Sequence, residues 1–422
     1  MKYLIFPLII FMLNFNGLNA KSILIPMDNS QKNHLKSYGI VYNHLKNGQN
    51  EIRWCLNYLG GAFIINYDND LYGKIISQGI TCTTLKDQET DILINELKSI
   101  ESNSEVVILN KFARIALYSP SSASPWDDAV SLALRYAEIP FETIYDQDIL
   151  NGRLIEFDWI HLHHEDFTGQ MGKMFTQKDQ LWYQNQLIED KNVAKNNGFK
   201  KVSNLKNKIT IMLKSFIIGG GYMFAMCTAT DTFDISLASS ELDIIDYSLD
   251  GDQTSDNINS SLKFQETLAF TNFSIYTNPR VNEFSDIDAS PNFSTRIIQE
   301  DLDYFELNDF SSKNDLIPSM LNQNHEKIIH GFMGQTTTFS TSKIKPNVII
   351  LAENQKLEEV KYLYGTLGKG FFCFLGGHDP EDYQHFVNEE HTDLSLHKNS
   401  PGYRLILNNI LFPSAQKKKQ KT

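Results

Sequence analysis

The sequence predicts an α/β protein whose core is a mostly parallel sheet with helices on both faces. Apolar runs of strand length alternate with helical runs over residues 22–110, and the alternation starts again at Ala113. Such a βαβ rhythm indicates parallel strands. Helices are recognised by apolar residues three and four apart, as in Leu35 and Tyr38.

The elements are expected in two groups separated by an insertion. Residues 21–110 are predicted as an N-terminal βαβ extension with strands at 23–25 and 52–58. Residues 241–345 are rich in Asp, Asn and Ser and are predicted as a polar, partly ordered insertion. The core, 111–240 and 346–412, is expected to be a flavodoxin-like sheet. Its strands and helices are expected at 113–118, 126–139, 141–145, 157–163, 202–218, 222–226, 348–351, 369–375 and 403–411.

Residues 1–20 are predicted as a signal peptide. Lys2 supplies a positive charge, residues 3–13 are apolar, and Ala20 fits the last position before cleavage. The apolar run is shorter than the roughly 20 residues that span a bilayer, and no later run is of spanning length. We therefore expect a periplasmic or secreted protein with no transmembrane segment in the mature chain.

The charge of the chain argues against nucleic acid as a partner. The formal net charge is −13, whereas phosphate binding needs clustered Lys and Arg. The basic tail, 413–422, is expected to be a solvated end. Four cysteines are present, and none has the CxxC spacing of a metal or redox site.

Three polar clusters follow predicted strands, at the positions where open α/β sheets bind ligands. They are 161–166 (His-Leu-His-His-Glu-Asp), 227–231 (Cys-Thr-Ala-Thr-Asp) and 376–382 (Gly-Gly-His-Asp-Pro-Glu-Asp). Their shared place predicts a cleft for a small molecule, either an amide or a sugar. The residues expected to bind it are His163, His164, Glu165, Asp166, Thr228 and Asp231.

Cys227 is the candidate nucleophile. It follows a strand and precedes a helix whose dipole would favour the thiolate. His378 is the candidate base, with Asp379 or Glu381 orienting its ring. The backbone N–H of Thr228 is expected to bind an oxyanion. The alternative is a small buried thiol without reactivity.

Two further interpretations stay open. Zinc is an alternative cofactor, with His163, Asp166 and His378 as its ligands, because imidazole and carboxylate are normal zinc ligands. The same residues also fit a polar strand end that holds no metal. In the other interpretation the cleft binds a sugar or another small ligand without chemistry, and the insertion acts as a lid. The thiol mechanism itself needs no cofactor.

Several motifs resemble known families. The strand order, the Cys227 turn, and segment 364–370 followed by Gly377-His378-Asp379-Pro380 resemble the class I glutamine amidotransferase-like superfamily, most closely its trehalose-utilisation-protein branch. Residues 25–28, 124–129, 161–166 and 378–383 are similar to a family of exported bacterial proteins often labelled asparagine synthetase B. The resemblance implies a Cys-dependent amidase or hydrolase, with His378 as the partner of Cys227.

Overall fold

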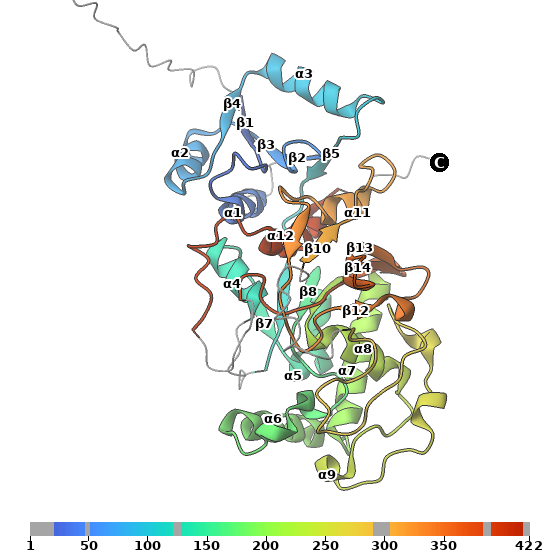
Figure 1. Cartoon of the computed structure of the whole chain (residues 1–422). Coiled ribbons are helices and arrows are strands. Elements are labelled where there is room, and N and C mark those ends of the chain that lie inside the picture. The colour runs from blue at the N-terminus through green and yellow to red at the C-terminus, as the bar shows by residue number, and fades with distance from the viewer. Residues whose placement is uncertain (1–20, 47–50, 121–127, 290–303, 383–389, 417–422) are drawn as a thin grey trace, which may run out of the picture.

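The computed structural model describes residues 21–46, 51–120, 128–289, 304–382 and 390–416 (Figure 1). The predicted signal peptide, the first residues of the predicted helix at 126 and the lysines of the basic tail lie outside these residues. The described chain forms two sheets, a small one built from the N-terminal residues and a large one built from the rest. No helix among the described residues is both long and apolar enough to cross a bilayer.

The small sheet is antiparallel throughout. Its strands, in spatial order, are β4 (Thr83–Leu85), β1 (Ser22–Ile25), β3 (Ala62–Asn66), β2 (Ile52–Leu56) and β5 (Glu105–Leu109). Its helices are α1 (His34–Leu45), α2 (Asn69–Ser77) and α3 (Asp87–Lys98). Asn33 begins α1 as its N-cap, because its side-chain oxygen accepts a hydrogen bond from Lys36 N at 3.1 Å.

The predicted N-terminal βαβ extension is therefore wrong. A tight turn joins β2 directly to β3, and Asn57, Leu59, Gly60 and Gly61 all have positive φ there. A Cβ at Gly60 would lie 2.2 Å from Met27 O, so only glycine fits that position. The turn reverses the chain without a crossover helix, and the two strands pair antiparallel.

The large sheet is mixed. In spatial order its strands are β11 (Ile328–His330), β10 (Tyr304–Leu307), β13 (Ile349–Asn354), β14 (Glu359–Leu367), β15 (Gly370–Leu375), β9 (Tyr222–Met226), β8 (Trp159–Leu162), β6 (Ile115–Tyr118) and β7 (Glu142–Ile144), and β12 (Phe339–Ser340) pairs with β14. The strands from β15 to β7 run parallel. The strands from β11 to β14 are antiparallel to their neighbours.

The predicted flavodoxin-like, mostly parallel sheet with helices on both faces is wrong for the same reason as the extension. A hairpin at Gly368, with φ 61°, joins β14 to β15 and begins the antiparallel half. Strands β10, β11 and β12 come from the segment expected to be a polar insertion, 241–345, and complete that half. Short apolar runs have the same appearance in parallel and antiparallel strands, so the sequence pattern did not reveal the hairpin.

The second part of the chain also forms eight of the described helices. They are α4 (Ala129–Tyr136), α5 (Asp146–Leu150), α6 (Leu181–Asn196), α7 (Val202–Gly219), α8 (Thr228–Ala238), α9 (Tyr247–Asp250), α11 (Leu316–Leu321) and α12 (Pro401–Leu411). Of these, α7 and α8 pack on the large sheet and α6 packs on α7. One buried apolar cluster joins the small sheet, α1, α4 and α12 to one face of the large sheet. A second cluster packs α7 and α8 against the opposite face. The layer of α1, α4 and α12 thus has a sheet on either side (Figure 1).

Arg404 of α12 connects this layer to the small sheet. Its guanidinium is fully buried and donates to Met27 O and Gly60 O, both at 2.7 Å, and to His325 Nδ1 at 2.9 Å. The His325 ring stacks on His34 with ring centroids 4.1 Å apart. Burial, and then the neighbouring Arg404 charge, lower the pKa of His34 to about 4.

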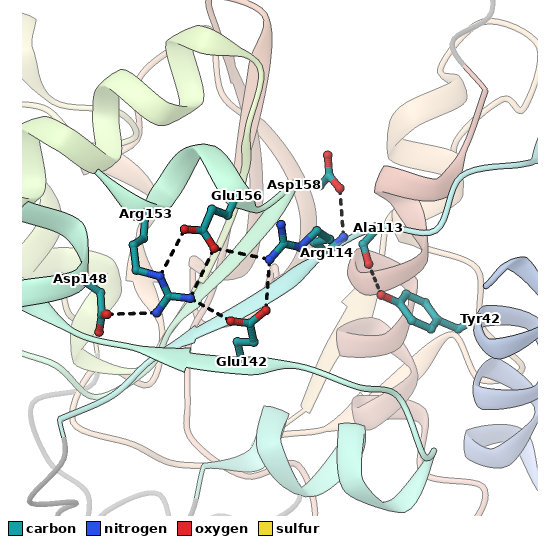
Figure 2. A network of polar contacts seen from close by, with 8 residues as sticks. All are labelled: Tyr42, Ala113, Arg114, Glu142, Asp148, Arg153, Glu156 and Asp158. Carbon is teal, nitrogen blue, oxygen red and sulfur yellow. Dashed lines mark hydrogen bonds and ion pairs between the residues drawn. The ribbon is translucent and has the colours of Figure 1, made fainter. Parts of the chain in front are cut away.

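The amino ends of β6, β7 and β8 carry an ion-pair network (Figure 2). Glu142 accepts from Arg114 at 3.1 Å and from Arg153 at 2.9 Å. Asp158 accepts from the Arg114 backbone N–H at 2.9 Å, and Tyr42 of α1 donates to Ala113 O (Figure 2). The arginine and glutamate side chains are about one third to one half exposed, so each pair contributes little stability. The network fixes the edge of the sheet opposite to the one where the polar clusters gather.

We predict that acid destabilises the fold through His34. In the unfolded chain the His34 imidazole binds a proton near pH 6.5, whereas in the folded protein it stays neutral until about pH 4. The free energy of unfolding therefore falls as pH decreases from 6.5 toward 4. At about 1.4 kcal/mol per pKa unit, the loss from this group is roughly 3 kcal/mol. Urea unfolding between pH 7 and pH 4 measures it. His34→Gln should show a shallower pH dependence than the parent protein, and equal slopes in both proteins would contradict the assignment.

Candidate functional site

Three separated segments meet at the carboxyl ends of β8, β9 and β15. The Ala229 N–H donates to His163 O at 2.9 Å, which joins the start of α8 to the end of β8. The Cys227 N–H donates to Gly377 O at 3.2 Å, which joins the end of β9 to the loop after β15. The three polar clusters predicted from sequence therefore share one rim of the large sheet.

Three imidazoles converge at this rim. The His163 ring lies 4.3 Å from the His378 ring and 4.8 Å from the His164 ring, measured between centroids. One potential ligand atom from each of the three residues lies within 4.8 Å of the other two. His163 and His378 are buried, and His164 is half-buried. We call these three residues the histidine cluster; its geometry is suited to holding a metal ion.

A second group of potential metal ligands shares His163. It consists of Asp128, His161 and His163, and we call it the Asp128 cluster. Asp128 is the N-cap of α4, where its Oδ1 accepts from Val130 N at 2.8 Å and Ser131 N at 3.2 Å. Burial by itself would raise the pKa of Asp128, but His161 and His163 hold it well below its ordinary value.

Cys227 occupies a strained turn between β9 and α8. Its φ of 52° and ψ of −139° are unfavourable for a residue with a Cβ. A strand-to-helix turn of this kind presents the nucleophile in many hydrolases. Here, however, the side chain is only 4% exposed. Burial raises the pKa of its thiol, although the backbone N–H groups of Gln335, Thr228 and Thr336 act in the opposite direction.

The loop that approaches the Cys227 sulfur is held by a buried lysine. Lys361 of β14 donates to Phe332 O at 2.6 Å and to Thr337 O at 3.0 Å. A Cβ at Gly376 would lie 2.3 Å from Thr337 O, so glycine allows this loop to pack against the end of β15. Loop 332–337 therefore has a fixed position beside the thiol.

The two carboxylates expected to orient His378 have other contacts. Glu381 Oε2 lies 2.9 Å from His397 Nδ1. Asp379 is buried, and its Oδ1 accepts from the Glu381 backbone N–H at 2.8 Å. Burial raises the pKa of Tyr403 well above its ordinary value, and the adjacent Asp379 carboxylate raises it further. The structure brings Cys227 and His378 to one rim, but it pairs Glu381 with a different histidine.

Of the predicted substrate-binding residues, His163 and His164 belong to the histidine cluster and the other four do not. Asp166 does not join the histidine cluster and instead accepts from Thr168 N at 2.7 Å and Gly172 N at 3.0 Å. Glu165 follows His164, and burial raises its pKa to about 8 against the lowering effect of Lys206. Asp231 is buried, accepts from Thr336 Oγ1 at 3.0 Å and has a raised pKa caused first by burial. Thr228 Oγ1 is buried and makes no hydrogen bond within the described residues.

Sequence reasoning missed three contributors to this site. Asp128 lies in the segment predicted as a helix, 126–139, and His161 lies in the predicted strand 157–163, but neither was among the residues expected to bind a ligand or a metal. Their convergence depends on the packing of α4 against the end of β8, for which no local signal exists. Lys361 was missed because no strand was predicted where β14 lies, and a lysine is normally solvent-exposed.

Comparisons with known proteins leave the identity of the chain open. No family model and no curated protein matches it. Solved structures that share some likeness are the cytoplasmic proteins STM1381 and STM3548 from Salmonella typhimurium, each at 10% identity over 72% of this chain and 100% of the other, with TM-scores of 0.33 and 0.32. Gan42B, a GH42 beta-galactosidase, has a TM-score of 0.28 at 7% identity, over 64% of this chain and 28% of its own. At these TM-scores the likenesses carry no argument.

We predict that Cys227 reacts slowly with a thiol reagent in the native protein. All four cysteines are free, and only Cys82 is partly exposed. Labelling with an aromatic disulfide should show one faster thiol in the folded state and four after unfolding. Cys82→Ser should remove the faster phase and Cys227→Ser should leave it. The opposite result would show that the rim thiol is accessible.

Proposed function

We propose that the rim is the active site of a metal-assisted hydrolase that cleaves an amide or ester bond in a small molecule. The single observation that carries this proposal is the convergence of His163, His164 and His378. Three imidazoles fit zinc in a catalytic arrangement, in which a fourth position stays open for water or substrate. When bound, the metal supplies a water molecule with a lowered pKa and polarises the scissile carbonyl.

The residues of the chain have defined tasks in this proposal. His163 Nδ1 lies 3.3 Å from Asp128 Oδ1, so His163 would bind the metal through Nε2 and have its ring oriented by a carboxylate. The backbone N–H groups at the start of α8 would stabilise a developing oxyanion. Glu165 has no assigned task, because its raised pKa comes from burial and its neighbouring charges are Lys206, Asp190 and Asp146.

A Cys-dependent amidase is the second candidate function, and the strained turn at Cys227 favours it. In that reaction His378 takes up the thiol proton, the thiolate attacks the carbonyl carbon, and the leaving amine receives that proton as the C–N bond breaks; water then hydrolyses the acyl thioester and restores the thiol. The raised thiol pKa opposes this mechanism, because little thiolate exists at neutral pH. The resemblance to the glutamine amidotransferase-like superfamily and the export of the protein remain predictions from sequence. Non-covalent binding of a sugar is a further possibility that the same experiments test.

Metal content tests the first candidate directly. We predict that the purified protein binds zinc and that His164→Gln and His378→Gln each lose one zinc equivalent by elemental analysis. Affinity at this site should fall by more than the roughly 10- to 100-fold typical of an outer-shell partner. His397→Gln is the matched control, because His397 pairs with Glu381 outside the cluster. Unchanged zinc binding in the cluster variants would overturn the proposal.

Hydrolysis of an activated ester separates the candidates. A metal-assisted hydrolase should lose turnover on treatment with a chelator and recover it on addition of zinc, and Cys227→Ser should retain most activity. A thiol mechanism predicts the reverse, with loss of turnover in Cys227→Ser and no effect of the chelator. Tight binding of a sugar without turnover in any variant would favour a binding protein.

A further inference from the structure

The chemistry of the Asp128 cluster depends on the proton position of His161. His161 Nδ1 lies 3.1 Å from Phe224 O. A carbonyl oxygen only accepts, so Nδ1 carries the proton and donates it. In a neutral imidazole the other nitrogen, Nε2, then holds a lone pair. His161 is fully buried, and its Nε2 makes no hydrogen bond within the described residues.

That lone pair faces a carboxylate. His161 Nε2 lies 3.4 Å from Asp128 Oδ1, and His163 Nδ1 lies 3.3 Å from the same oxygen. Two acceptors that face each other in a buried place need a positive charge between them. A proton shared between imidazole and carboxylate would bring the atoms to about 2.7–2.9 Å. At the observed separations each contact is at most a weak hydrogen bond, and a metal ion fits between the atoms.

The separations match the edges of a metal coordination tetrahedron. Zinc binds nitrogen and carboxylate oxygen at about 2.0–2.2 Å, which places neighbouring ligand atoms about 3.3–3.5 Å apart in a tetrahedron. An octahedral ion with similar bond lengths would place neighbouring ligands only about 3 Å apart. The two Asp128 separations are those expected for tetrahedral zinc.

The surroundings of the cluster suit a bound cation. The N–H groups of Val130 and Ser131 fix the Asp128 oxygen at the start of α4. The bond to Phe224 O fixes the His161 ring, as outer-shell partners do in metal sites. The Asp128 side chain is 19% exposed, whereas the two histidines are almost fully buried. A water molecule or ligand would therefore reach the open fourth position from the side of Asp128.

We propose that Asp128, His161 and His163 form a second zinc site, in addition to the site formed by the histidine cluster. His163 belongs to both groups. Its Nδ1 faces Asp128, so its two ring nitrogens would bind one metal each once the ring has released its N–H proton to solvent, and the resulting imidazolate would bridge the two ions. The inference goes beyond the proposed hydrolase, because it gives Asp128 and His161, which are outside the histidine cluster, a metal-binding role; with the second ion bound, Asp128 would be a metal ligand and no longer only the group that orients the His163 ring.

Zinc stoichiometry tests the proposal. The parent protein saturated with zinc should hold two equivalents of zinc. The His161→Gln and His164→Gln variants should each hold one equivalent, and His163→Gln should bind zinc tightly at neither site. Asp128→Asn keeps an oxygen for the helix cap but removes the charge, and it should weaken only the second site. Asp68→Asn is the matched control, because Asp68 caps α2 in the same way, at 2.8 Å from Leu71 N, and is not part of either cluster.

Each outcome has one meaning. Loss of one equivalent in His161→Gln but not in His164→Gln supports the second site and overturns the hydrolase site. Loss in His164→Gln with no change in His161→Gln and Asp128→Asn overturns the second site. Thermal unfolding of the zinc-free variants shows whether the folded state is retained. Cobalt substitution provides an independent measurement, because the absorption of tetrahedral Co²⁺ should fall by half in His161→Gln; an octahedral spectrum at that site would overturn the assignment.

Discussion

The parallel register of β8, β9 and β15 is the constraint on which the candidate site depends. Leu162 pairs with Ala225, and Met226 pairs with Leu375, so the three strands end almost level. Residues that follow these strands are thereby brought together without any local contact between them in sequence. A register shift of one residue in β8 would turn His161 and His163 to the opposite face of the sheet, which would remove His163 from the histidine cluster and both histidines from the Asp128 cluster.

Helix α4 and the rim support each other. The carboxylate of Asp128 satisfies N–H groups at the start of the helix and also contacts two imidazoles at the end of β8. Its position is therefore set by helix packing as well as by the sheet. Arrangements of this kind hold ligand atoms more closely than side chains on a mobile loop do, which is a requirement for selective metal binding.

The sequence predicted individual elements more successfully than their arrangement. The strand at 222–226 and the helix at 202–218 agree with β9 and α7, since the helix has a clear apolar period and ends at glycine, and the strand is an apolar run that begins directly after Gly221. Strand direction was wrong wherever a hairpin replaced a crossover, as at Gly60 and Gly368. The meeting of Cys227, His163 and His378 followed from the general rule for strand ends. The contribution of Asp128 did not, because tertiary packing of α4 creates it.

The buried guanidinium of Arg404 determines how the molecule unfolds. Its hydrogen bonds to Met27 O and Gly60 O cannot be replaced by water while the apolar layer around α12 stays closed. If the N-terminal residues separated from the rest, the Arg404 guanidinium would stay buried without its two carbonyl acceptors. The two sheets should therefore unfold in one cooperative transition. A chain shortened to begin after Leu109 would lose both backbone carbonyls that accept from this guanidinium and keep only His325 as a partner, so shortening it there is a poor starting point for crystallisation or assay.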